Sequence, residues 1–285
     1  MNKTRRLLRE RMRRCDLVVE ALDARLPRSS QNPMLTDIRG SVPCLKVLTK
    51  PDLADPEVTE KWIAALQGQG HAVIALQTTE QRNAKKLVQA CKKVVPRRGS
   101  HGLPVRTMIA GIPNVGKSTL FNLLAGKKKA TVRNQPAVTR QEQHIETPYG
   151  LSLFDTPGVL WPKLEDQIGA YRMATSGAIG IGALDPVEVA LFAIGFLDGA
   201  YPGALGSRYK VLEGPASPSE RLTEIAITRG LLVRGGEPDR AKAAELLLRE
   251  LRAGKLGRIS YESPGVLSQA GPEDAKALAE SEPEE

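Results

Sequence analysis

The chain has 285 residues, of which 41% are hydrophobic, so it can hold one large or two ordinary domains with a sizeable core. It lacks an apolar run of membrane-spanning length, a signal peptide and paired cysteine motifs, and we therefore expect a cytoplasmic protein without disulfide bonds or a cysteine-bound metal. The net charge is +9, but the last 21 residues carry −5, so the first 264 carry +14; this favours a polyanionic partner such as nucleic acid, with plain solubility charge as the alternative.

Strand and helix patterns alternate through the first 164 residues. Residues 2–14 predict a basic surface helix with a thin apolar stripe. Short apolar or β-branched runs predict strands at residues 16–23, 42–48, 72–76, 107–110, 144–147 and 151–154, and helical periodicity predicts helices at 57–69, 83–94 and from 117 onward. Because strands that alternate with helices form parallel sheets, we expect an α/β domain with a mostly parallel sheet over residues 1–164.

The pattern becomes helical from residue 165. Apolar residues recur at a spacing of three to four over 170–175, 187–197, 219–229 and 238–252, which predicts an all-α domain over 165–264. An acidic tail follows at 265–285, and its composition predicts disorder. Cations crowd the last helix and form either a solvated face or an RNA-contacting one: Arg240, Lys242, Arg249, Arg252, Lys255 and Arg258.

A phosphate-binding loop is predicted at residues 111–118, which read G-I-P-N-V-G-K-S and match G-x-x-x-x-G-K-[ST]. The glycines let backbone N–H groups face a phosphate, Lys117 places a positive charge on the β- and γ-phosphates, and the Ser118 hydroxyl can ligate Mg²⁺. An ordinary Gly-rich turn is the alternative, but the apolar strand before the loop and the helix after it are the required context. The stretch therefore predicts nucleotide binding.

A guanine-binding motif of the form [N/T]-K-x-D is predicted at Thr49, Lys50 and Asp52, directly after an apolar strand. The Asp accepts hydrogen bonds from the N1 and N2 donors of guanine. Thr49 stands where Asn is usual and offers one hydroxyl in place of an amide, so we expect base selection to be less tight. Gln77 and Thr78 follow the next strand, at the place of a second, weaker guanine-contacting loop.

Two further motifs concern Mg²⁺ and the γ-phosphate. Residues 155–158 read D-T-P-G; this D-x-x-G pattern is common by chance, but its place after a strand and downstream of the phosphate loop gives it weight. Asp155 would hold Mg²⁺ through water, and the Gly158 N–H would sense the γ-phosphate. Thr139 is the candidate Mg²⁺ ligand in the polar loop 127–140. Val159 stands where many GTPases place the Gln that positions water, which an aliphatic side chain cannot do.

The order of these motifs is distinctive. In most GTPases the guanine motif follows the phosphate loop and D-x-x-G, whereas here it precedes both, so the chain is circularly permuted. With D-A-R-x-P at 23–27, G-I-P-N-V-G-K-S-T at 111–119, P-x-V-T-R at 136–140 and a helical C-terminal domain, the chain closely resembles the ribosome biogenesis GTPase A (YlqF) family over residues 1–262. The resemblance implies a GTPase that binds the immature large ribosomal subunit and promotes its late maturation, and we expect a monomer.

The resemblance also implies roles for individual residues. GTP, Mg²⁺ and K⁺ are the expected cofactors, and hydrolysis is expected to be slow alone and stimulated by ribosomal subunits and potassium. Asn114 matches the residue that ligates K⁺ beside the phosphates in related GTPases; a loop-stabilising Asn is the alternative. The expected catalytic residues are Lys117, Asn114, Thr139 and Gly158. Further nucleotide contacts are expected from Val115, Gly116, Ser118 and Thr119.

The family carries a catalytic His just before a Met-x-Lys sequence. Residues 1–3 match that sequence, which puts the His one residue before Met1, so either the true start lies upstream or the enzyme lacks this His. His144 is the strongest of the remaining histidines, while His71 and His101 fit a strand edge and a linker. None of the three is placed among the catalytic residues.

Two other functions stay open. One is a GTPase that serves tRNA modification or another RNA process. The other is a non-hydrolysing RNA-binding assembly factor that uses GTP only to set its shape, which the missing His makes credible. In either case the segment after residue 158 leads directly into the helical domain, so we expect a γ-phosphate-dependent movement of this loop to pull on that domain.

Overall fold

The computed structural model describes residues 2–96, 103–126, 144–154, 167–179, 184–211 and 214–265. These residues form two compact units. The first consists of Met1–Asp52 and Thr59–Lys163, and the second of Leu53–Val58 and Leu164–Glu285. The short segment Leu53–Val58 thus groups with the second unit, although it lies within the sequence of the first.

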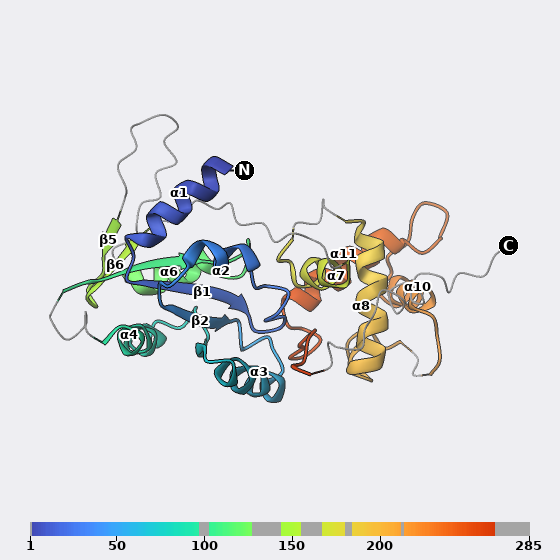
Figure 1. Ribbon diagram of the computed structural model, residues 1–285. Coiled ribbons are helices and arrows are strands. Elements are labelled where there is room, and N and C mark those ends of the chain that lie inside the picture. Colours follow the sequence, from blue (N-terminus) through green and yellow to red (C-terminus); the bar gives the residue numbers. More distant parts are fainter. Residues whose placement is uncertain are drawn as a thin grey trace. The chain divides into compact units, whose positions relative to one another are not determined.

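The first unit is built on a six-stranded sheet with the order β3-β2-β1-β4-β6-β5 among the described residues (Figure 1). The strands are β1 (Leu17–Asp23), β2 (Cys44–Thr49), β3 (Ala72–Leu76), β4 (Val105–Ala110), β5 (His144–Glu146) and β6 (Leu151–Phe154). All neighbouring strands are parallel except β5 and β6, which are antiparallel. The predicted mostly parallel sheet is therefore confirmed.

The central strand β1 lies between β2 and β4 and is buried along its whole length. Its unbroken sequence L-V-V-E-A-L-D suits a strand that is covered on both faces. Because β1, β2 and β4 are parallel neighbours, their carboxyl ends meet at one edge of the sheet. The D-A-R-x-P motif, the guanine motif and the phosphate loop each follow one of these ends, so the topology brings all three together.

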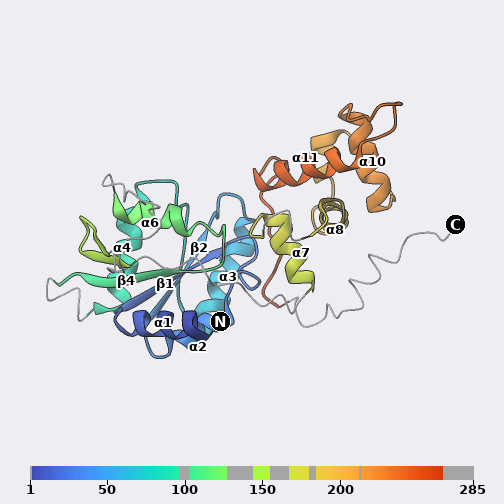
Figure 2. The same cartoon turned by 90° about the horizontal axis from the view of Figure 1, so that it is seen from above.

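Helices cover both faces of this sheet. The helices of the unit are α1 (Asn2–Arg13), α2 (Pro33–Arg39), α3 (Pro56–Gly68), which begins in the segment that groups with the second unit, α4 (Asn83–Val94) and α6 (Lys117–Ala125). Figure 2 shows α1 and α2 on one face and α4 and α6 on the other. Leu8 and Met12 of α1 pack with Leu35 and Ile38 of α2 against the sheet, so the predicted apolar stripe of α1 is buried.

Sequence analysis missed α2, which has only seven residues. Asn32 caps its N-terminus by accepting a hydrogen bond from the Met34 N–H, and Pro33 occupies the first turn. This N-cap and Pro combination is a helix-start signal, but the helix it opens is too short to show clear periodicity.

The second unit is helical, as predicted for this part of the chain. It contains α7 (Gln167–Ser176), α8 (Pro186–Ala200), α9 (Ala204–Tyr209), α10 (Pro218–Thr228) and α11 (Arg240–Arg252). Helix α8 packs against the other four. The core of the unit includes aliphatic side chains from three helices: Ala193, Ile194 and Leu197 of α8, Leu222 and Ile225 of α10, and Leu247 and Leu248 of α11.

Helix starts in this unit carry the expected caps. The Asp185, Ser217 and Asp239 side chains each accept a hydrogen bond from the first turn of α8, α10 and α11, respectively. Glu220 completes a capping box with Ser217. The short α9 was not predicted. Among the described residues, no helix is both long enough and apolar enough to cross a membrane.

Candidate guanine-nucleotide site

The phosphate loop runs from the end of β4 to the start of α6. Gly111 adopts a φ of 146°, and a Cβ placed on it would lie 2.5 Å from the Ala21 carbonyl oxygen. Gly116 is left-handed, with a φ of 98°, and precedes the first residue of α6. Both positions require glycine, because β1 passes close to the first and the backbone turns sharply into the helix at the second. The predicted loop is therefore confirmed in its backbone geometry.

Lys117 opens α6 with its ammonium group turned back over the loop. Its Nζ donates a hydrogen bond of 2.5 Å to the Ile112 carbonyl oxygen. Burial lowers the pKa of Lys117. Ser118 and Thr119 follow in the first turn; Ser118 is exposed, so its hydroxyl is open to a ligand at the helix N-terminus, where the helix dipole favours anions.

Thr49, the last residue of β2, is fully buried against the phosphate loop. Its Oγ1 lies 2.5 Å from the Val115 carbonyl oxygen and 3.0 Å from the Leu22 carbonyl oxygen. A hydroxyl has one proton, so it donates to one of these carbonyls at a time. The side chain thus ties the end of the guanine-motif strand to the phosphate loop and to β1.

The carboxylate of Asp23, at the end of β1, anchors two cations. Arg25 donates to it through Nε (2.9 Å) and Nη2 (2.8 Å), and the Lys50 Nζ lies 2.9 Å from its Oδ2. The same Nζ donates to the Asn114 carbonyl oxygen at 2.8 Å. Burial alone raises the pKa of Asp23, but the charges and hydrogen bonds of Arg25 and Lys50 outweigh burial and hold the pKa below its ordinary value.

This network links three motifs that are far apart in the sequence. Asp23 and Arg25 belong to D-A-R-x-P, Lys50 to the guanine motif, and Asn114 to the phosphate loop. Lys50 and Asn114 both have a φ of 55°, a left-handed conformation that costs free energy in a residue other than Gly. The Lys50–Asn114 hydrogen bond joins these two strained residues directly, and Asp23 fixes the cation that makes it.

The roles of Asp23 and Arg25 in the D-A-R-x-P motif were not predicted from the sequence. The signal was an acid and a base two residues apart at the end of a mostly apolar strand, where a buried charge needs a partner. The role itself depends on the adjacency of β1 and β2, which pairs Asp23 with Thr49 across the sheet.

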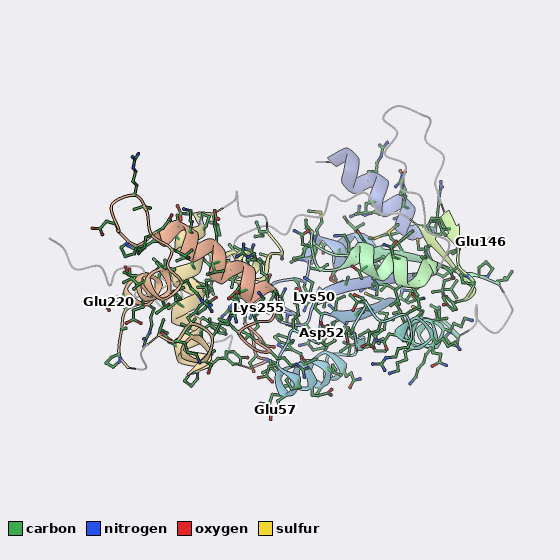
Figure 3. The ribbon with its side chains drawn as sticks, turned by 180° about the vertical axis from the view of Figure 1, so that it is seen from behind. Lys50, Asp52, Glu57, Glu146, Glu220 and Lys255 are labelled. Carbon is green, nitrogen blue, oxygen red and sulfur yellow. The ribbon has the colours of Figure 1, made fainter. Side chains whose placement is uncertain are left out.

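The two segments that are predicted to contact guanine lie at the same sheet edge. Asp52 follows β2 and is exposed; Figure 3 labels it with Lys50. Gln77 and Thr78 follow β3, the parallel neighbour of β2, and the Gln77 carbonyl accepts a hydrogen bond from the Asn83 side chain. That bond fixes the turn between β3 and α4. The base-binding role of these residues stays a prediction.

Several predicted residues lie outside the described part of the chain. These are Thr139, Asp155, Gly158, Val159 and His101. His144 begins β5, whereas His71 precedes β3 and so lies at the amino edge, opposite the predicted site. Burial and the nearby Lys46 lower the pKa of His71. The structure therefore gives His71 no place at this site.

Comparisons with known proteins agree with this geometry. A family described as 50S ribosome-binding GTPase matches residues 106–192. Proteins called ribosome biogenesis GTPase A are 42% identical in Bacillus cereus, over 93% of this chain and 92% of the relative, and 40% identical in Priestia megaterium, over 94% and 96%.

Two solved structures of YlqF are also similar to the chain. One is described as GDP-bound and the other, from Thermotoga maritima, as GNP-bound. Both have a TM-score of 0.67 and 27% identity; they cover 90% and 92% of this chain and 99% of their own. Circular permutation of the GTPase motifs and a C-terminal helical part fit these neighbours.

Proposed function

The chain belongs to the ribosome biogenesis GTPase A family, whose members are GTPases that act in ribosome assembly, and from this membership we propose that it binds the immature large ribosomal subunit and promotes its late maturation. We place it in the cytoplasm, as a monomer, hydrolysing GTP slowly alone and faster on the subunit.

The observation that carries this proposal is the joined site. Lys50 connects the guanine motif to the Asn114 carbonyl of the phosphate loop, and Thr49 makes a second connection at Val115. The segments that are predicted to recognise the base and to bind the phosphates are thus bonded to each other at one edge of the sheet, which supports a guanine-nucleotide site over a general phosphate site.

The residues present suit GTP with Mg²⁺ and K⁺. Lys117 supplies positive charge for the β- and γ-phosphates, and the exposed Ser118 hydroxyl is a hard oxygen ligand for Mg²⁺. In the proposal Thr139 and Asp155 complete the Mg²⁺ site and Gly158 senses the γ-phosphate. The Asn114 side chain would hold K⁺, whose charge adds to that of Lys117 on the transferring phosphoryl group.

Exposed cations support an RNA partner. Helix α1 buries Leu8 and Met12 and leaves Arg6, Arg9 and Arg13 exposed, so its cationic face is open for phosphate contacts. The cations predicted around α11 do not form a single face. Arg240, Lys242, Arg249 and Lys255 are exposed, whereas Arg252 is half-buried and donates to the carbonyls of α7.

The test is multiple-turnover GTP hydrolysis in KCl and in NaCl, with and without purified large ribosomal subunits. We expect stimulation by subunits, in potassium more than in sodium. The matched variant is Asn114→Gly, because Gly adopts the same left-handed backbone without strain and keeps the carbonyl that Lys50 contacts. This variant should lose the preference for potassium and keep GDP binding.

Three outcomes would contradict parts of the proposal. Tight GTP binding with no stimulation by subunits would favour the non-hydrolysing assembly factor. Failure to co-sediment with large subunits, together with stimulation by another RNA, would favour the second GTPase function. A potassium preference that survives Asn114→Gly would remove Asn114 from the K⁺ site.

A further inference from the structure

The helical unit contains a cavity of about 580 Å³ with a strongly basic lining, which we call the cationic pocket. It is formed by the turn from α8 into α9 and by the segment that follows α11. Its polar lining includes Ser207, Arg208, Lys255 and Arg258. Figure 3 labels Lys255 at the end of α11.

One buried carboxylate stands behind this lining. Glu250 of α11 accepts hydrogen bonds from Arg208 Nε (2.8 Å) and Nη2 (2.5 Å), and the Lys255 Nζ lies 3.3 Å from its Oε1. The hydrogen bond from Arg208 is the main reason that the pKa of Glu250 falls to about 2. Glu250 is therefore ionised at neutral pH. Its single negative charge stands against the positive charges of Arg208, Lys255 and Arg258, so the lining together with Glu250 has a net charge of about +2.

The same carboxylate holds the cations in place. A bidentate Arg–carboxylate pair has a fixed geometry, so the N–H groups of Arg208 that do not bond to Glu250 are held in a fixed orientation. The Lys255 side chain is 54% exposed, and Ser207 adds an exposed hydroxyl. Fixed donors at the mouth of an open cavity suit a phosphate oxygen, which accepts several hydrogen bonds at once.

The wall of the cationic pocket is also bonded to the segment after the guanine motif. Arg258 Nε donates to the Ala54 carbonyl (2.9 Å), Ile259 N–H donates to the Leu53 carbonyl (2.9 Å), and Ser260 Oγ accepts from the Asp55 N–H (3.1 Å). All of these residues belong to the second unit. We call residues 53–55 the strap. Since Leu53 directly follows Asp52 in the chain, the strap connects the wall of the cationic pocket to the guanine motif.

We propose that the cationic pocket binds a phosphate of an RNA backbone, and that its occupancy changes the release of guanine nucleotide through Arg258 and the strap of residues 53–55. The inference rests on the proposed function, because it takes its ligand from ribosomal RNA. RNA is favoured over an acidic protein because the fixed donors of Arg208 and the exposed Lys255 and Ser207 suit a phosphate oxygen, and a polyanion gains from every phosphate that such donors neutralise. The positive charge of the lining is local, since residues 164–264 hold 12 basic and 13 acidic residues. By thermodynamic linkage, the factor by which RNA changes the affinity for nucleotide is the factor by which bound nucleotide changes the affinity for RNA.

The first experiment measures binding of a labelled RNA hairpin and of purified large subunits over a series of salt concentrations. Lys255→Gln should weaken RNA binding about three- to tenfold and reduce the slope of log K against log salt by about one, as expected for one lost phosphate contact. Ser207→Glu, which adds a negative charge at the mouth, should weaken it further. The matched control is Lys242→Gln, on α11 before the segment that carries Lys255, outside the pocket and 65% exposed; it should change affinity less than twofold.

The second experiment measures GDP release with and without saturating RNA hairpin. In the wild-type chain RNA should change the release rate at least threefold. Ser260→Ala removes the hydrogen bond to Asp55 and should reduce that change, while the RNA affinity of the nucleotide-free chain stays the same.

The outcomes distinguish failure of the cationic pocket from failure of the proposed function. If Lys255→Gln and Ser207→Glu bind RNA like the wild type while subunits still stimulate hydrolysis, the pocket is refuted and the proposed function stands. If both variants lose subunit binding but not RNA binding, the partner is an acidic protein and the phosphate site is refuted. RNA binding without any change in GDP release refutes the coupling. A wild-type chain that binds neither RNA nor subunits refutes the proposed function together with the pocket.

Discussion

Replacing Asp23 by Asn tests the network that joins the three motifs. The substitution keeps the size of the side chain but removes its charge. An amide oxygen can still accept from Arg25 at the Oδ1 position, where the bond is 2.9 Å. At the Oδ2 position an NH₂ group would face the Arg25 Nη2 (2.8 Å) and the Lys50 Nζ (2.9 Å), which are both donors.

The structure gives the size of the effect. Two charge-assisted hydrogen bonds, each worth about 1.5–3 kcal/mol, are replaced by contacts between donors. A buried cation is left behind, since only 3% of the Arg25 side chain is exposed, and breaking a buried ion pair on one side typically costs about 3–5 kcal/mol. We therefore expect Asp23→Asn to lower the free energy of unfolding by about 3–5 kcal/mol. GDP release should be about tenfold faster, because Lys50 is no longer held against Asn114.

Urea unfolding and the rate of GDP release measure the two effects. Asp16→Asn is the matched control, since Asp16 precedes the same strand at its other end and pairs with Arg106, whose side chain is 40% exposed. Its cost should be about 1 kcal/mol or less, with no change in GDP release. The reasoning is refuted if Asp23→Asn costs no more than Asp16→Asn, or if it unfolds more easily but releases GDP at the wild-type rate.

Three further predictions use other parts of the structure. Gly111→Ala should abolish nucleotide binding in a GDP titration, because its Cβ would collide with the backbone of β1, while the control Gly199→Ala, in α8 with open space around it, should leave binding unchanged and raise the melting temperature slightly. Thr49→Val should lower the free energy of unfolding by about 1–3 kcal/mol and speed GDP release, because the Val115 carbonyl loses its donor, as urea unfolding and stopped-flow release would show. Because the pKa of Glu250 is lowered to about 2 in the folded chain, its contribution to stability is present above the ordinary value of 4.5 and lost as the pH falls toward 2; Glu250→Gln should flatten the dependence of melting temperature on pH in this range.

The sequence carries enough information for the phosphate loop, because its glycines have strict local requirements. Gly111 and Gly116 both adopt backbone conformations that favour glycine, and the strand and helix around them follow local periodicity. The parallel sheet follows from alternation in the same way. The predicted bounds of β3 and α4 match the observed ones, which shows that local patterns suffice where an element is long enough or bounded by clear breaks.

The contacts of the site depend on strand order, which local patterns do not specify. Asp23 and Lys50 are 27 positions apart in the sequence, and Lys50 and Asn114 are 64 apart. Their hydrogen bonds form because β1 lies between β2 and β4. A sequence shows that each strand is buried but not which strand is its neighbour. The hydrogen bonds of the strap, residues 53–55, could not be predicted for the same reason, because their partners lie about 205 positions away in the sequence.

Circular permutation gives this arrangement a mechanical consequence. The guanine motif ends at Asp52, and the next residue already belongs to the helical unit. The D-T-P-G motif ends at residue 158, and the chain enters the same unit at Leu164. The two motifs that are predicted to contact nucleotide thus continue within a few residues into one helical unit, because the permuted order places both of them before it in the chain. The two motifs predicted to contact the base and the γ-phosphate are therefore each joined by a short chain segment to the unit that carries the cationic pocket, and we expect a ligand there to respond to whether nucleotide is bound and to which nucleotide it is.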